Sequence, residues 1–413
     1  MNGVETMADT GGTKLRNLHL ILKTIDGAGE ATAAMLTEHT GLSAATISRG
    51  LNILKSRKLV VQRRKDATEV GRRPEVFAID PSYGYYLYFW LENGQLRGYL
   101  LDLSGKTTAR AVLPAGSETT VERLLEMLRQ LRDQLLMSRK RAVDKLLAVN
   151  LAIPGLADVS SGVISRIPNY PCFENVDLAG QVFQALGLPC FVHNAARLTA
   201  VGEYLHSGGE LENLVYVDIT GDGIGAGIIL HGELYEDRNC LAGEIGDMVI
   251  DVEKSGWQEP KTQGALERQA GLGAVYRELE RLLAEGHAKE LRTLMEQKKT
   301  TSLSVPLLEK AVANLDLDVY EVLNQATKAW AAAIVNIAAL LSPDVVVLGG
   351  AVNESDQLIE KMVRHHLGRM YYRPIHLRLA KKDADAHVLG AAHLSKKYLF
   401  DVVLNEFLDE LGT

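Results

Sequence analysis

Apolar residues near the start of the chain recur at the three- and four-residue spacing of an α-helix. This spacing predicts a first helix over Leu15–Ile25, a second over Ala31–His39 and a third from Ala44 to about Arg57. Between the last two, Gly41 tolerates the positive φ of a tight turn, and Ser43 suits the N-cap of the third helix. The order is typical of a helix-turn-helix.

The third predicted helix has two unlike faces. Ile47, Leu51 and Leu54 share one face at core spacing, whereas the opposite face carries small and polar residues. Small residues let a helix approach the major groove closely, and Ser, Arg and Asn side chains can reach base edges. The predicted DNA contacts from this helix and its start are Ser43, Ala44, Ala45, Thr46, Ser48, Arg49, Asn52 and Lys55.

Two short strands with arginines between them are predicted to follow. Leu59–Arg64 alternates weakly, and Val76–Ile79 can pair with it as a β-hairpin. Arginine suits phosphate contacts or a narrow minor groove. The predicted contacts from this wing are Arg63, Arg64, Arg72 and Arg73. Residues 14–80 therefore read as a winged helix-turn-helix that binds DNA.

The charge distribution favours the same interpretation. Residues 14–80 contain 12 Lys and Arg against 7 Asp and Glu, although the whole chain has a net charge of -7. A basic head on an acidic body is expected of a nucleic-acid-binding module joined to another domain. Three short helices could also form a simple cap, and an arginine-rich hairpin is often only a solvated surface. The combination, in this order, favours DNA binding.

Residues 1–13 are expected to form a flexible arm. Asp9–Lys14 matches the phosphate-binding motif Asp-x-Gly-Gly-Thr-Lys of sugar kinases. That motif works where a hydrophobic strand delivers it at a sheet edge, and the polar residues before it predict no such strand. The match is therefore interpreted as chance.

Beyond residue 80, strand patterns alternate with helical ones. Predicted strands are Tyr85–Leu91, Leu96–Leu103, Leu146–Ile153, Leu214–Ile219, Gly225–Leu230 and Val345–Leu348, and predicted helices include Val121–Leu136 and Tyr320–Leu341. The alternation predicts an α/β body in two lobes over residues 81–398. Residues 399–413 are expected to form a separate amphipathic helix that packs on the body or on a partner subunit, with packing inside the chain favoured.

Composition excludes some classes of protein. The chain is 46% hydrophobic and 23% charged, which is ordinary for a globular protein, and it has no apolar run long enough to span a bilayer. The polar start is not that of a signal peptide. We expect a cytoplasmic protein with no membrane partner.

Nine short motifs, in order along the chain, resemble those of the ROK family (repressors, open reading frames and kinases), in the branch that carries a winged helix-turn-helix. They are Gly41–Ser43, Gly71–Pro74, Ile153–Gly155, Ile167–Asn169, Gly221–Gly225, Ala242–Gly246, Gly264–Glu267, Val347–Gly350 and Leu389–Ala392. The resemblance implies a two-lobed actin-like (ribonuclease H-like) sugar-kinase fold for the body and a homo-oligomer, most simply a dimer.

Measured against the kinases of that family, the chemistry is incomplete. The catalytic base is the Asp of an Asn-Asp-Ala-Asn run, and the matching run Asn194–Arg197 has Ala195 in its place. The first phosphate loop is replaced by Trp90–Gln95, and Asp222 stands where a Thr usually faces the phosphates. We expect no enzyme activity and no cofactor.

The structural zinc of many relatives is also not expected. Its ligands would be a His after Gly-Glu-Ile-Gly and the cysteines of a CxCGxxGC run. This chain has Asp247 and the run Gln258–Ala265, with no thiolate or imidazole among them.

Residues that resemble the family's sugar contacts remain in part. The predicted effector residues are Asn169, Asn194, Glu244, Asp247 and Glu267, since amides and carboxylates offer paired donors and acceptors to a polyhydroxylated ligand. The alternative is that Glu244 and Glu267 cap helices and that the pocket is vestigial.

The preferred hypothesis is a DNA-binding transcriptional regulator, a repressor of carbohydrate-metabolism genes. A homodimer would bind a double-stranded operator, and a sugar or sugar derivative in the body would change the affinity. Two alternatives remain open: a sugar kinase with an atypical base, and a DNA-binding regulator that responds to no ligand.

Overall fold

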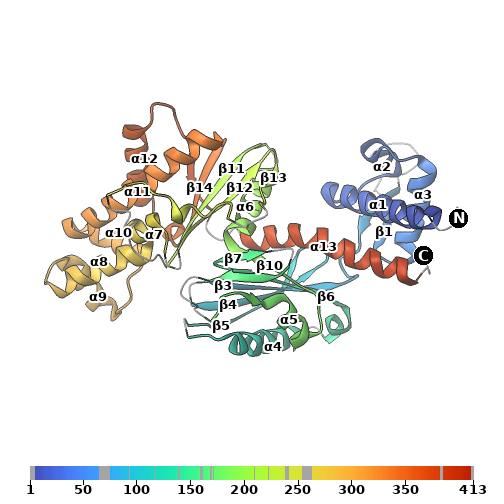
Figure 1. Cartoon of the computed structure of the whole chain (residues 1–413), viewed down its shortest axis with the longest axis horizontal. Coiled ribbons are helices and arrows are strands. Elements are labelled where there is room, and N and C mark those ends of the chain that lie inside the picture. Colours follow the sequence, from blue (N-terminus) through green and yellow to red (C-terminus); the bar gives the residue numbers. More distant parts are fainter. Residues whose placement is uncertain are drawn as a thin grey trace.

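The computed structural model describes the chain except for several short stretches. These are residues 1–4, 65–74, 93, 117, 138–139, 159–160, 168–169, 171, 209, 222, 238–240, 254–262, 382–384 and 411–413. The described parts form a small N-terminal head beside two α/β lobes, with one long helix running from between the lobes to the head (Figure 1).

The head contains three helices and a hairpin: α1 (Glu5–Ala28), α2 (Ala33–Thr40), α3 (Ala44–Ser56), β1 (Val60–Arg64) and β2 (Glu75–Ile79). The strands are antiparallel, with Val60 opposite Ile79 and Arg64 opposite Glu75. Leu22, Leu36 and Leu54 are fully buried where the three helices meet, because each lies on the apolar stripe of its helix.

The flexible arm expected at residues 1–13 is wrong for residues 5–13, and residues 1–4 lie outside the described part. Helix α1 begins at Glu5, so residues 5–13 extend the first helix by more than two turns. The glycines Gly11 and Gly12 weaken a helix by about 1 kcal/mol each without removing a backbone donor. A run without proline can therefore continue the helix even though it adds no apolar stripe.

The first lobe is built on a five-stranded sheet with the order β10-β6-β3-β4-β5. Its strands are β3 (Tyr85–Glu92), β4 (Gln95–Asp102), β5 (Thr107–Pro114), β6 (Leu146–Ile153) and β10 (Cys190–Asn194). The first three form an antiparallel meander, whereas β6 and β10 run parallel to β3. Helices α4 (Val121–Met137) and α5 (Leu178–Leu186), the 3-10 helix η1 (Lys140–Lys145) and a small sheet of β7 (Leu156–Asp158), β8 (Val163–Arg166) and β9 (Val176–Asp177) complete it.

The second lobe repeats the same topology. Its sheet has the order β13-β12-β11-β14-β15, again an antiparallel meander followed by two strands parallel to the first. The strands are β11 (Leu214–Ile219), β12 (Ile224–Leu230), β13 (Glu233–Leu234), β14 (Val345–Gly350) and β15 (Leu377–Leu379). Two copies of one sheet order, facing each other, are what the expected actin-like fold requires.

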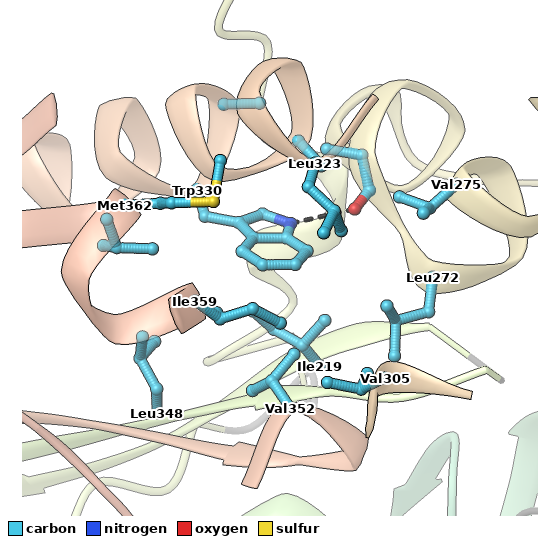
Figure 2. Packing of buried hydrophobic residues seen from close by; sticks show 14 of the residues in the cluster. Ile219, Leu272, Val275, Val305, Leu323, Trp330, Leu348, Val352, Ile359 and Met362 are labelled. Carbon is cyan, nitrogen blue, oxygen red and sulfur yellow. Dashed lines mark hydrogen bonds between the residues drawn. The ribbon is translucent and has the colours of Figure 1, made fainter. Parts of the chain in front are cut away.

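Helices cover the outer face of the second sheet. They are α7 (Ala265–Ala270), α8 (Leu272–Ala284), α9 (Lys289–Lys298), α10 (Val305–Ala313), α11 (Leu317–Leu341) and α12 (Leu358–Met370), with the 3-10 helices η2 (Ile245–Asp247) and η3 (Ala351–Glu354). Figure 2 shows their core, in which Trp330 of α11 packs among aliphatic side chains. The indole N–H of Trp330 donates to the Ala270 carbonyl oxygen at 2.8 Å, so burial leaves this polar group paired.

Helices α6 (Ala195–His206) and α13 (Ala386–Glu410) lie against each other between the lobes. The separate C-terminal helix expected at residues 399–413 is wrong in its boundary, because α13 is one continuous helix that begins at Ala386. Its described later residues Leu399, Phe400, Val403 and Leu404 are buried. They pack within the chain, as favoured from the sequence. In the described chain, no helix combines the length and apolarity that crossing a membrane requires.

Candidate DNA-binding interface and effector pocket

The start of helix α3 has the predicted turn geometry. Gly41 ends α2 with φ 69°, the left-handed conformation that glycine adopts without strain. Ser43 is the N-cap of α3, and its Oγ accepts a hydrogen bond from the Thr46 amide at 3.2 Å. The Ser43 hydroxyl is therefore engaged in holding the helix, so its contribution to a DNA surface is to position α3.

The two faces of α3 are separated as the sequence predicts. Ile47, Leu51 and Leu54 are buried against the head's core. Ala44, Ala45, Ser48, Arg49 and Asn52 are exposed, and Thr46 and Lys55 are half-buried. The exposed face thus starts with two methyl-sized side chains and continues with a hydroxyl, a guanidinium and an amide, a set that fits a major groove.

Two of the cationic residues on this face have partners inside the head. The Arg49 Nε donates to the Ala45 carbonyl oxygen at 3.3 Å, a long bond on an exposed side chain. The Lys55 Nζ donates to Gln62 Oε1 at 3.1 Å and lies 5.6 Å from the centroid of the Phe77 ring. Lys55 therefore links α3 to the hairpin, while Arg49 remains at the surface.

The wing is described only near its base. Arg63 lies on β1 opposite Val76 and is exposed. The backbone of Arg64 is in the strand, but its side chain lies outside the described part, as do Arg72 and Arg73 altogether. The DNA contacts assigned to all four wing arginines, Arg63 included, stay predictions.

A small cavity of about 50 Å³ lies between the lobes, where β6, β10 and β11 end. It brings together the predicted Asn194, Glu244 and Glu267. Asp247 is exposed and is not among the residues that line the cavity, and Asn169 lies outside the described residues. The full lining is Pro154, Gly155, Asn194, Ala195, Ala196, Asp218, Thr220, Gly223, Ile224, Gly225, Glu244 and Glu267.

Asn194 and Glu267 also hold the frame of this cavity. The Asn194 amide donates to the Gly155 carbonyl oxygen at 3.0 Å, and its Oδ1 caps α6 by accepting from the Arg197 amide at 3.2 Å. Glu267 accepts from the Ile224 amide at 3.0 Å and from the Gly264 amide at 3.2 Å. The capping role left open by the sequence is therefore real for Glu267, which nevertheless faces the cavity.

Glu244 differs from these two because its side chain makes no capping hydrogen bond. Burial, and next the negative charge of Glu267, raise the pKa of Glu244 to about 7. Near neutral pH this carboxyl is therefore partly protonated, so it can donate as well as accept a hydrogen bond. Such a group suits a sugar hydroxyl, which also does both.

The loop that carries Glu244 is held by Arg197, the last residue of the run that replaces the kinase motif. Arg197 is 6% exposed, and its Nη2 donates to the Ala242 carbonyl oxygen at 2.9 Å. Its guanidinium lies 3.6 Å from Asp237, whose carboxylate accepts from the Ala242 amide at 2.9 Å. Arg197 thus joins the first turn of α6 to the wall of the cavity.

Asp218 is a pocket residue that the sequence reasoning missed. It stands near the end of β11, lines the small cavity, and also lines a neighbouring cavity of about 560 Å³. Its position just before the turn at Gly221 was an available signal, because polar residues at the carboxyl ends of strands gather at α/β sites. The two cavities therefore meet at Asp218.

The larger cavity is lined by aromatic, acidic and basic side chains from both lobes. The Trp90 and His387 rings lie tilted by 43° with their centroids 3.8 Å apart, and the Arg97 guanidinium lies 5.2 Å from the centroid of the Trp90 ring. Glu92 and Asp218 add carboxylates to the lining. Burial, with Arg97 next, lowers the pKa of His387 to about 3, which keeps its ring neutral.

No three His, Cys, Asp or Glu side chains meet in a metal-binding arrangement within the described stretches. Part of the run that would replace the zinc ligands, residues 258–262, lies outside them. The expectation of no zinc site therefore stays a prediction from the sequence.

Comparison with known proteins decides the family, because the ROK family model matches residues 93–398. The chain belongs to the ROK family. The xylose repressor of Bacillus spizizenii is 24% identical over 405 residues, which cover 96% of this chain and 99% of the relative. The regulator NagC of Escherichia coli is 25% identical over 405 residues, 96% of each chain.

Two solved structures share this fold. A ROK transcriptional regulator, a homologue of the E. coli MLC protein, superposes with a TM-score of 0.75 at 24% identity, covering 96% of this chain and 99% of its own. A ROK glucokinase from Streptomyces griseus, in complex with glucose and AMPPNP, has a TM-score of 0.63 at 20% identity and covers 75% of this chain and 99% of its own. The head thus lies within the part matched by the regulator.

Proposed function

We propose that this ROK protein is a sugar-responsive DNA-binding repressor whose kinase-like body is not catalytic. One observation carries the proposal: the chain has a capped helix with an outward Ser-Arg-Asn face, and it aligns over nearly its whole length with a xylose repressor and with a DNA-binding transcriptional dual regulator. This face supplies base-reading groups, and the exposed Arg63 on the wing supplies a phosphate contact.

The kinase alternative lacks its chemical group. Ala195 is buried at the first turn of α6 and has no proton acceptor, where the family resemblance places the catalytic base. Glu92, in the run that replaces the first phosphate loop, places a carboxylate in the lining of the larger cavity, and Asp218 adds a second one. Both features oppose phosphoryl transfer, although kinases share the fold.

The small cavity is the proposed effector site, and effector binding requires it to open. Its volume of about 50 Å³ is well below the roughly 300–1,000 Å³ of typical small-molecule sites. Because it lies between the two lobes, it can grow by a rotation of one lobe against the other. A sugar would then change the geometry of the body rather than fill a preformed hole.

The protein is proposed to bind DNA as a homodimer. A dimer would place two copies of α3 in successive major grooves, roughly 34 Å apart, and would favour a pseudo-palindromic operator. Sedimentation of the protein with and without its operator would measure this stoichiometry.

The first test selects duplexes from a random library with the full chain and measures their affinity by fluorescence anisotropy. If the Arg49 guanidinium reads a base, Arg49→Ala is expected to weaken binding to the selected duplex by about 1–3 kcal/mol. It should also reduce the base preference at one position of the site. Arg63→Ala is expected to weaken binding to all duplexes alike. It should also reduce the slope of log affinity against log salt concentration by about one. Arg123→Ala, an exposed arginine on α4, is the control.

Unchanged affinity in both head variants would overturn the DNA-binding proposal. The effector is sought by adding xylose, glucose and N-acetylglucosamine to the same anisotropy assay, with Glu244→Gln as the pocket variant. ATP turnover on these sugars tests the competing class, and robust phosphorylation by the wild-type chain would establish an enzyme.

A further inference from the structure

Helix α13 is one element with its two ends in different parts of the molecule. Ala386 and His387, at its start, line the large cavity in the interlobe cleft. Its later residues Leu399, Phe400 and Leu404 belong to the same buried cluster as Leu18, Ile21 and Ile25 of α1 in the head. Figure 1 shows the helix, in red, running from beside α6 to beside α1.

At the body end, α13 meets the backbone of α6 directly at two glycines. Gly202 of α6 lies against the backbone of Ala386, and Gly390 of α13 lies against the carbonyl oxygen of Leu198. A Cβ at either glycine would overlap those backbone atoms. Backbone contact at two points leaves no side-chain rotamer to absorb a displacement, so the two helices move together.

The start of α6 is part of the effector pocket. Its N-cap is Asn194, and Ala195 and Ala196 of its first turn line the small cavity. Arg197 ties the same turn to the loop of Glu244. Any opening of the pocket that moves these walls therefore moves α6 as well.

At the head end, α13 is fixed by packing and by charge. The Lys396 Nζ donates to Asp26 Oδ1 of α1 at 2.7 Å, with the two side chains 16% and 21% exposed. The Phe400 ring meets the His19 ring edge-on with centroids 6.3 Å apart. A partly buried ion pair beside an apolar cluster holds orientation more firmly than an exposed pair does.

We propose that α6 and α13 move as one rigid unit, the lever, which couples the interlobe pocket to the orientation of the DNA-binding head. The backbone contacts at Gly202 and Gly390 form the joint that holds the two helices together. The Lys396–Asp26 pair is the anchor that attaches α13 to the head. The proposal rests on the DNA-binding function proposed above. Coupling between two sites is reciprocal, so if a ligand in the pocket changes the affinity for DNA through the lever, DNA binding must also change the pocket's affinity for that ligand.

That reciprocity gives a test that needs no effector. Hydrogen–deuterium exchange of the full chain is measured with and without a duplex that the protein itself has selected. DNA binding is expected to change exchange in residues 195–206 and 386–395, which lie outside the head, and to leave α4 and α8 unchanged. Changes confined to residues 14–80, or spread equally over α4 and α8, would overturn the lever.

If no duplex can be selected, the DNA-binding function fails and the lever with it. If a duplex binds and the change stays in the head, the lever alone fails. The two failures are therefore distinguishable in one experiment.

Two glycine variants test the joint itself. Gly390→Ala inserts a methyl group against the α6 backbone, whereas Gly368→Ala, in α12, meets no atom within 4 Å and is the matched control. Gly390→Ala is expected to change the affinity for the selected duplex by about fivefold or more, and Gly368→Ala by less than twofold. Wild-type affinity in a folded Gly390→Ala protein would overturn the proposal.

Should Gly390→Ala fail to fold, Lys396→Gln tests the anchor instead. This change removes the ion pair at the edge of the cluster and leaves the helix intact. It is expected to reduce the DNA-induced exchange change in residues 195–206 while the head still binds DNA. An undiminished change in those residues would count against the lever.

Discussion

Glu244 offers the sharpest perturbation of the pocket, because Gln keeps its shape and cannot ionise. The pKa of Glu244 is raised to about 7 by burial first and by Glu267 second, against an ordinary value of 4.5. A carboxyl whose pKa is raised on folding binds more protons folded than unfolded between these values. The free energy of unfolding therefore falls as pH rises from about 4.5 to about 7.

The size of the effect follows from the shift. Each pKa unit corresponds to about 1.4 kcal/mol, so the full shift corresponds to about 3 kcal/mol. Glu244 is half-buried rather than sealed, and solvent reduces this figure to about 1–3 kcal/mol. The penalty is small below pH 5 and fully present above pH 8.

Urea unfolding of wild type and Glu244→Gln at pH 5 and at pH 8 measures this quantity. The free energy of unfolding of the variant, relative to that of wild type, is expected to rise by about 1–3 kcal/mol from pH 5 to pH 8, because the variant never carries the buried charge. Glu280→Gln, at an exposed position on α8, is the control for general charge effects. An equal difference between variant and wild type at both pH values would refute the assignment.

Three further changes test the frame around the sites, each by thermal unfolding or circular dichroism. Ser43→Ala removes the N-cap hydrogen bond of α3 and is expected to lower the free energy of unfolding of the head by about 1 kcal/mol. Ser43→Asp, which can accept the same bond, should restore the stability. Trp330→Phe leaves the buried Ala270 carbonyl oxygen without its donor and is expected to lower the free energy of unfolding by about 1–3 kcal/mol. A decrease below about 0.5 kcal/mol would contradict a stabilising role for the hydrogen bond drawn in Figure 2. Asp316→Ala removes a buried carboxylate that accepts from two backbone amides and is expected to cost about 2 kcal/mol, with Asp316→Asn intermediate.

The head could be predicted from the sequence because its determinants are local. Gly41 and Ser43 mark a turn and a cap within three residues, and the apolar stripe of α3 repeats within single turns. Strand positions in both lobes were predictable for the same reason, since buried strands are short apolar runs.

What escaped prediction depends on contacts between distant residues. The start of α13 at Ala386 and its anchorage on α1 rest on pairs such as Asp26 and Lys396, which are 370 positions apart. Periodicity within a window carries no information about such pairs. Asp218 was missed although it stands near a strand end, because only the packing of the two lobes brings the end of β11, in the second sheet, beside the ends of β6 and β10, in the first. The extension of α1 to Glu5 was missed because it lacks an apolar stripe.

The residues of the pocket do not all carry the same weight as evidence for a ligand. Asn194 and Glu267 each cap a helix, so the fold alone accounts for an amide at one position and a carboxylate at the other. Glu244 has no such capping bond, and its burial beside Glu267 costs stability above neutral pH. A destabilising group without a structural task is expected where a ligand is bound. Loss of the sugar response in Glu244→Gln would therefore identify the pocket as a sensor, and an unchanged response would place the effector elsewhere.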